Sequence, residues 1–254
     1  MLFLLTAMLG SCAPLPADSL SPTTTATDAS APTPTIVWFP ASPTPPPQSF
    51  PTEISTPEQK PGVGAATLRD DFSQPELWHP GSSNQGSALI AENNLALTVP
   101  AGSSILRIRE DLVLNDFYAE LTARPSLCRD QDEYGLLVRA SAVAYYRLSL
   151  LCNGTLRLDR VSGNSHQNLL PVTPSGDVPT GVPAEVRIGV WAAGSEMRFF
   201  LNDHYQFSMD DGNYLSGTLG VFVRSVADTP VAVAFSNLTI YDVNYSPPAK
   251  TPAP

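Results

Sequence analysis

The segment between residues 134 and 160 contains three arginines and a tyrosine at positions that strand alternation places on one face of a sheet. These candidate ligand-binding residues are Arg139, Tyr145, Arg147 and Arg157. Guanidinium groups offer forked N–H donors for sugar hydroxyls or uronate carboxylates. The four side chains are therefore candidates for a glycan-binding platform. The alternative is a solvated polar face on which Asp159 and Glu133 neutralise the arginines.

Trp191 is a fifth candidate, because an outward tryptophan is a residue type that stacks on sugar rings. A hairpin turn at Ala193–Gly194 would place Trp191 beside Glu196. The same register would place Arg187 beside Phe200 as a cation–π pair. The equal alternative is that Trp191 folds over the edge of the core.

The acidic residues and histidines show no catalytic pattern. The densest acidic run, residues 130–133, precedes a predicted strand and indicates a solvated loop or a weak cation site. His79, His166 and His204 are isolated in turn-like contexts, away from any metal-ligand or nucleophile pattern. No catalytic residue is predicted, although carboxylates from distant strands can still meet at glycosidase separations.

The residues above are predicted to lie on the strands of an all-β domain over residues 69–243. Alternating polar and apolar residues predict eight strands: 117–123, 134–139, 145–151, 155–160, 185–191, 196–201, 218–224 and 231–240. Turn residues such as Asn153–Gly154 and Asp211–Gly212 separate them, and no intervening segment has a long helical period. Many short antiparallel strands in this length imply a two-sheet sandwich.

Several motifs extend over nearly the whole of this domain. They are Asp71–Phe72 with Trp78, Asp116–Glu120, Tyr134–Leu136 with Arg139, Tyr145–Arg147, Asn153–Gly154, Leu201–Asp203, Gly217–Gly220 and Phe235–Leu238. Their order resembles the concanavalin A-like jelly roll, and more narrowly the keto-disaccharide hydrolase type and its laminin-G-like relatives. The resemblance implies a jelly-roll fold. It also suggests a structural calcium ion between the first and last strands, with Asp70, Asp71 and Asp242 as candidate ligands, and no other cofactor.

Composition separates this domain from its flanks. Residues 12–68 are rich in proline, threonine and serine, which predicts a disordered, semi-stiff linker, and residues 244–254 form a second proline-rich tail. The formal net charge of −10 argues against nucleic acid as a partner.

The N-terminus predicts export. Residues 2–10 are apolar but too short to span a bilayer, which indicates a signal peptide over residues 1–11. The stretch Leu9-Gly10-Ser11-Cys12 resembles the lipobox of bacterial lipoproteins, which implies lipidation of Cys12 and anchorage to the membrane of the cell envelope. The alternative is an ordinary secretory signal that contains an accidental cysteine.

The two remaining cysteines, Cys128 and Cys152, flank a predicted hairpin. In an exported protein a disulfide is the default pairing, and two free buried thiols are the alternative.

Three functions fit these features. The leading one is a surface-tethered, non-catalytic jelly-roll module that binds a polysaccharide or cell-wall glycan. The second is a glycoside-cleaving enzyme of the keto-disaccharide hydrolase type. The third is a structural envelope lipoprotein that contacts protein partners through an exposed apolar patch.

Overall fold

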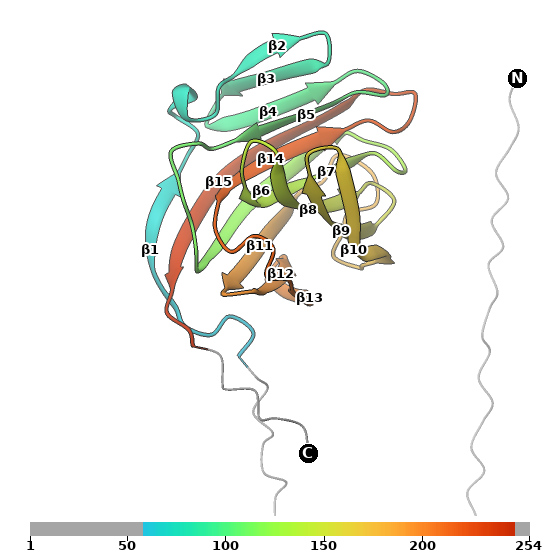
Figure 1. The fold of residues 1–254 in the computed structure, drawn as a ribbon. Coiled ribbons are helices and arrows are strands. Elements are labelled where there is room, and N and C mark those ends of the chain that lie inside the picture. The colour runs from blue at the N-terminus through green and yellow to red at the C-terminus, as the bar shows by residue number, and fades with distance from the viewer. Residues whose placement is uncertain (1–57, 247–254) are drawn as a thin grey trace, which may run out of the picture. The chain divides into compact units, whose positions relative to one another are not determined.

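The computed structural model describes residues 58–246, which form two antiparallel β-sheets packed face to face (Figure 1). The predicted all-β sandwich is confirmed, and its only helical element is the short 3-10 turn η1 (Pro75–Leu77). No helix within residues 58–246 has the length and apolar character needed to cross a membrane. The predicted signal peptide, Cys12, residues 12–57 of the predicted linker and residues 247–254 of the tail lie outside the described residues.

The larger sheet has nine strands in the order β13-β12-β11-β6-β15-β4-β3-β2, and β1 pairs with β15 off this path. Its strands are β1 (Val63–Asp70), β2 (Gly81–Ser83), β3 (Gly86–Ala91), β4 (Asn94–Val99), β6 (Phe117–Leu127), β11 (Val186–Ala193), β12 (Glu196–Leu201), β13 (His204–Asp210) and β15 (Val231–Val243). The long strands β6 and β15 lie at its centre and bring distant parts of the chain together.

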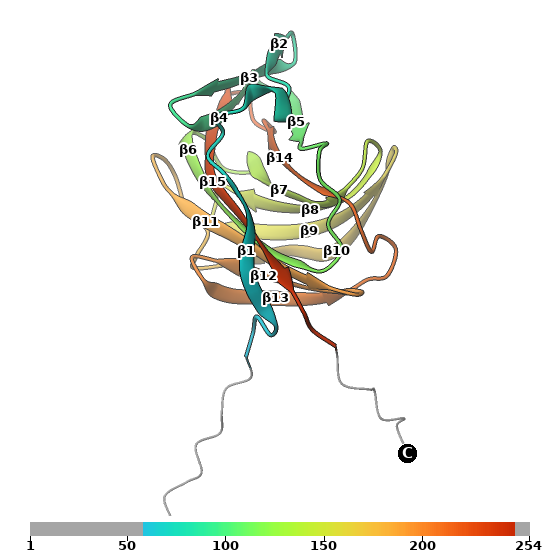
Figure 2. The same cartoon turned by 90° about the vertical axis from the view of Figure 1, so that its left-hand side faces the viewer.

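The smaller sheet has six strands in the order β10-β9-β8-β7-β14-β5. Its strands are β5 (Ser104–Ile108), β7 (Glu133–Ala140), β8 (Ala144–Leu151), β9 (Thr155–Ser162), β10 (Ser165–Pro174) and β14 (Thr218–Arg224). Figure 2 shows the curvature of β7–β10, with the β2–β3 hairpin beyond the β5 side of this layer.

The core lies between the two sheets and follows from strand alternation. Leu136 and Val138 on β7, Leu148 and Leu150 on β8, and Leu158 on β9 all point into it and are almost fully buried. This inward set was predicted from the alternation and is confirmed. The opposite side chains of the same strands form the outer face of the smaller sheet.

All eight predicted strands are present, and the structure adds strands that the pattern did not reveal. The β3–β4 hairpin is one of these. Its turn residues Glu92 and Asn93 both have positive φ, 50° and 58°, which is the backbone of a two-residue turn that usually favours Asn-Gly. A turn built from Glu-Asn gives a weaker sequence signal, so this hairpin escaped prediction.

The first strand begins at Val63, inside the range predicted as linker, so the predicted boundary at residue 69 is too late. Residues 58–62 also contact the larger sheet, because Arg198 Nη1 donates to the carbonyl oxygens of Glu58 and Gln59 at 3.2 and 3.1 Å. At the other end of the chain, Asn244 N donates to Gly62 O at 2.9 Å. The two ends of the described chain therefore leave the sandwich side by side (Figure 1).

Cys128 and Cys152 form the predicted disulfide, with Cα atoms 5.9 Å apart and a sequence separation of 24. The bond joins the end of β6 to the end of β8, across the loop that carries Asp132. This disulfide excludes the alternative of two free thiols.

Replacing both cysteines with alanine is expected to lower the free energy of unfolding by about 3 kcal/mol, because the open loop gains chain entropy in the unfolded state. Urea denaturation of the oxidised protein and of the Cys128→Ala/Cys152→Ala variant measures this difference. Added reductant should destabilise only the parent protein. Equal midpoints for parent and variant would contradict a structural role for the bond.

Candidate functional site

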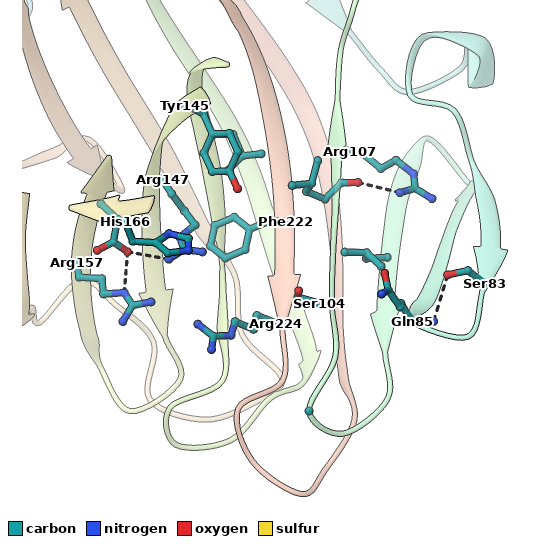
Figure 3. Close-up of a pocket in the computed structure, with 15 residues that line it drawn as sticks. Ser83, Gln85, Ser104, Arg107, Tyr145, Arg147, Arg157, His166, Phe222 and Arg224 are labelled. Carbon is teal, nitrogen blue, oxygen red and sulfur yellow. Dashed lines mark hydrogen bonds and ion pairs between the residues drawn. The ribbon is translucent and has the colours of Figure 1, made fainter. Parts of the chain in front are cut away.

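A groove of about 890 Å³ lies on the outer face of the smaller sheet (Figure 3). It is lined by Ser83, Gln85, Gly102, Ser104, Ile105, Leu106, Arg107, Leu137, Tyr145, Arg147, Arg157, Asp159, His166, Phe222 and Arg224. Strands β5, β7, β8, β9 and β14 supply most of these residues, and the β2–β3 hairpin adds one wall. The groove therefore has strands of the smaller sheet as its floor and one wall from the other sheet.

The sheet register fixes the positions of the groove side chains. One row runs across neighbouring strands from Phe222 to Gly135, then to Ser149 and Arg157. A β-carbon at Gly135 would collide with the carbonyl of Leu148 and lie 3.3 Å from the Phe222 ring. The absent side chain lets the Phe222 ring lie against the floor, where only 4% of the residue is exposed.

One half of the groove is apolar. Leu137, Ala140 and Phe222 form a small cluster on the outer face, and Ile108 and Tyr145 pack against it. Tyr145 is only half-buried, so part of its ring faces the groove. This half offers an aromatic surface of the kind on which a sugar ring packs.

The other half is cationic and is built on two buried carboxylates. Arg157 Nη2 donates to both carboxylate oxygens of Glu133 at 3.0 and 3.1 Å. Arg147 Nη2 donates to Asp159 Oδ2 at 3.0 Å, and Arg157 Nε lies 3.1 Å from the same oxygen. The side chains of Glu133 and Asp159 are only 3% and 7% exposed. The two carboxylates therefore lie beneath the guanidinium groups and attract them, and neither carboxylate is exposed in the groove.

Arg224 adds a third guanidinium group to this half. Its Nη1 lies 3.6 Å from Glu133 Oε1, beyond hydrogen-bond distance, and its side chain is 43% exposed. Figure 3 shows Arg147, Arg157 and Arg224 gathered on one side of the groove, opposite Ser83 and Gln85. Arg147 also lies over the Phe222 ring, with 5.7 Å between the guanidinium carbon and the ring centroid.

The structure brings Tyr145, Arg147 and Arg157 together in this groove, as alternation predicted. The predicted alternative is also partly realised, because Asp159 and Glu133 do pair with the arginines. The run of residues 130–133 is not simply a solvated loop, since Asp132 and Glu133 are 0% and 2% exposed.

Arg139 does not belong to the groove. Between two successive pairs of the β14–β7 ladder, β7 advances by three residues while β14 advances by two, which makes a β-bulge on β7. Arg139 lies in this bulge and has a φ of 49°. Its guanidinium turns inward and donates to the carbonyl oxygens of Tyr214 and Asn115 at 3.1 and 3.3 Å. Burial lowers the pKa of this arginine, opposed by Tyr146 and Asp116. The prediction of an exposed Arg139 is therefore wrong.

Trp191 does not face solvent either, because it is 0% exposed on the outer face of the larger sheet. Its Nε1 donates to Pro61 O at 2.9 Å, and Tyr245 packs edge-on with ring centroids 5.2 Å apart. The hairpin pairs Trp191 with Arg198 rather than with Glu196, and the Arg198 guanidinium carbon lies 4.6 Å from the ring centroid. Pro61 and Tyr245, near the two ends of the described residues, thus cover the predicted sugar-stacking surface.

The predicted cation–π pair of Arg187 and Phe200 is replaced by another one. Phe200 pairs with Gly189 in the sheet, and Lys60 Nζ lies 4.7 Å from the Phe200 centroid. The same ammonium group donates to Tyr118 Oη at 2.8 Å. Burial lowers the pKa of Lys60, while Glu120 raises it and Arg187 lowers it further.

The three candidate calcium ligands do not converge. Asp70 and Asp242 lie at opposite ends of the β1–β15 ladder, because Asp70 pairs with Leu238 and Val63 pairs with Val243. Asp71 is exposed and accepts a hydrogen bond from Ser73 N at 3.0 Å. Within residues 58–246, no three His, Cys, Asp or Glu side chains are grouped to hold a metal ion. The calcium prediction is wrong for this triad.

Sequence reasoning missed Phe222, Arg224 and Arg107 as groove residues. Phe222 and Arg224 stand at alternate positions of a predicted strand, which shows that they share a face but not what that face adjoins. Their place beside Gly135 and Glu133 follows from the pairing of β14 with β7. That pairing joins segments about 85 residues apart and left no sequence signal.

No protein-family model and no curated protein sequence matches the chain. Solved structures do match its fold. A carbohydrate binding module CBM66 from Bacillus subtilis is 15% identical, with a TM-score of 0.52 over 63% of this chain and 94% of that one. A Bacillus subtilis protein of unknown function with a galectin-like fold is 14% identical, with a TM-score of 0.52 over 72% and 99%.

The catalytic domain of an endo-1,3-beta-glucanase from Thermotoga petrophila is 8% identical, with a TM-score of 0.50 over 71% of this chain and 98% of that domain. Identities this low bear on the fold and not on the activity. The resemblance to the concanavalin A-like jelly roll is thereby confirmed.

Proposed function

We propose that this protein is a non-catalytic glycan-binding module and that its ligand lies in the groove on the smaller sheet. The observation that carries the proposal is the pairing of a partly exposed aromatic ring, that of Tyr145, with a guanidinium half formed by Arg147, Arg157 and Arg224. Aromatic rings pack on the apolar face of a sugar, and guanidinium groups donate to its oxygens.

The structural neighbours support the same class of ligand. They include a carbohydrate binding module and an endo-1,3-beta-glucanase catalytic domain, which are glycan-directed proteins by name. The shared fold raises the expectation of a glycan ligand by analogy, and the groove residues of this chain supply the physical argument.

The carboxylates of the groove support binding rather than cleavage. A glycosidase needs two carboxyl groups that reach the glycosidic bond from within the cleft. Glu133 and Asp159 are the acidic residues at this floor, and both are covered and held by guanidinium groups. Neither is placed to donate a proton to a leaving oxygen or to attack a sugar carbon.

A tethered location fits this function. We propose that Cys12 carries a lipid anchor and that the proline-rich linker holds the domain outside the cytoplasm at the cell envelope. The described chain ends contact the larger sheet, whereas the groove lies on the smaller one. Glu58, where the described domain begins, therefore lies against the sheet that does not form the groove floor.

A panel of immobilised neutral and acidic glycans, probed with the purified full-length chain, tests the function. We expect selective retention of one glycan class and an affinity about tenfold lower for Tyr145→Ala, because the aromatic surface is lost. Tyr205→Ala is the matched control, since Tyr205 is an exposed tyrosine on β13 of the other sheet. Failure of the folded protein to bind any glycan would refute the proposal.

A further inference from the structure

We infer that the ligand of the groove is an acidic glycan whose sugar units carry carboxylate or sulfate groups. The inference rests on the proposed glycan-binding function and narrows it to a chemical class. It follows from the balance of charge at the groove, from the kind of polar group exposed there and from the guanidinium group left without a close partner.

The charge balance of the groove differs in sign from that of the chain. The chain has 14 lysines and arginines against 24 acidic residues. Among the residues that the structure describes, the acidic partners of Arg147, Arg157 and Arg224 are Glu133 and Asp159, which leaves one positive charge uncompensated. Arg107 lines the opposite side and adds a fourth guanidinium group. An anionic group on the ligand would complete the balance.

The charged groups exposed in the groove are all hydrogen-bond donors. A guanidinium group has five N–H donors and no acceptor. The carboxylates that would accept from neutral sugar hydroxyls are buried beneath the arginines. A sugar hydroxyl both donates and accepts, so the guanidinium surface of this half satisfies it incompletely. A carboxylate or sulfate oxygen only accepts, and it matches this surface.

Arg224 is the guanidinium group with the most capacity for a ligand. Arg157 donates to both oxygens of Glu133, and Arg147 donates to Asp159. Arg107 donates to the carbonyl oxygens of His79 and Leu106 at 2.9 and 2.8 Å. Within residues 58–246, the Arg224 side chain makes one ionic contact, the 3.6 Å contact with Glu133, and 43% of the side chain is exposed. Its planar fork can therefore bind a carboxylate through two parallel hydrogen bonds.

The test compares polymers that differ only in charge. Retention of the full-length chain is measured on polygalacturonate and on the same polymer with its carboxylates methyl-esterified, and on dextran sulfate against dextran. We expect at least about tenfold tighter binding to one or both charged polymers, weakened by added salt because exposed charges are screened. Preference for the polyuronate or for the sulfated polymer identifies which acidic group the groove takes.

Two variants assign the effect to the groove. Arg224→Gln should weaken binding to the preferred charged polymer about tenfold and leave the fold intact, since the side chain is exposed. Arg187→Gln is the matched control, because Arg187 is 45% exposed and lies on the larger sheet beside Asp203. Equal losses in the two variants, or none in either, would overturn the assignment.

The remaining outcomes separate this inference from the function on which it rests. Equal binding of the acidic polymers and their neutral counterparts would overturn the inference and leave glycan binding in place. Equal binding of single-stranded DNA would overturn it as well, because the groove would then take any polyanion. Retention of no polymer by the folded protein would overturn the proposed function itself.

Discussion

Asp70→Ala is expected to lower the free energy of unfolding by about 3–5 kcal/mol, as is typical when one partner of a buried ion pair is removed. Asp70 Oδ2 accepts from Arg109 Nη1 at 2.5 Å and from Trp78 Nε1 at 2.8 Å, and Oδ1 accepts from Phe72 N at 2.7 Å. The variant leaves the guanidinium of Arg109, whose side chain is only 6% exposed, with Asp111 as its one acidic partner. Urea denaturation followed by tryptophan fluorescence measures the loss.

The neighbouring residue supplies a matched control for this variant. Asp71 is exposed and accepts a short-range hydrogen bond from Ser73 N. Hydrogen bonding from the Ser73 side chain, and then from Ser73 N, lowers the pKa of Asp71 below its ordinary value, but these contacts close only a local turn. Asp71→Ala should therefore change stability by less than about 1 kcal/mol. Similar losses in the two variants would show that the buried network does not stabilise the sandwich as described.

Asp132→Ala is expected to lower the free energy of unfolding by about 3 kcal/mol, because three part-buried backbone donors lose their acceptor at about 1 kcal/mol each, the lower end of the range for unsatisfied donors. Asp132 is 0% exposed. Its Oδ1 accepts from Val226 N and Ala227 N at 2.9 and 3.1 Å, and its Oδ2 accepts from Arg129 N at 3.0 Å. One carboxylate thus joins the disulfide loop to the loop that follows β14.

Two measurements check the role of Asp132. Chemical denaturation gives the loss of stability, with Asp228→Ala as the control, since Asp228 is an exposed acid in the same β14–β15 loop. Amide hydrogen exchange should show faster exchange at Val226 and Ala227 in Asp132→Ala only. Unchanged exchange at these two amides would contradict the role given to this carboxylate.

The sequence predicted the fold best where alternation is regular. Apart from the bulge at Arg139, the strands from Tyr134 to Arg160 keep a period of two, and their inward leucines are in the core. Strand β1 escaped because it follows directly on the proline-rich linker. Strand β10 escaped because most of its side chains are exposed, so burial imposes no apolar pattern on it.

The candidate site was predictable only within one run of strands. Tyr145, Arg147 and Arg157 share a face because β8 and β9 are consecutive and regular. Arg139 was misplaced because a bulge reverses alternation for a single residue, and nothing in its neighbours marks that bulge. Trp191 was misplaced because its cover comes from Pro61 and Tyr245, about 130 and 54 residues away in the sequence.

The hydrogen bond between Asn244 N and Gly62 O shows that the first and last described segments of the domain lie side by side. Opposite residues of an antiparallel pair have Cα atoms about 4.5–5.5 Å apart, so a peptide that leaves after Tyr245 and returns before Pro61 can join the two segments while Trp191 keeps its cover. New termini can then be opened in an exposed hairpin turn, such as the one at Gly163, without removing a strand from either sheet. The domain is therefore suited to circular permutation and to insertion into a loop of a host protein, with the groove carried along intact.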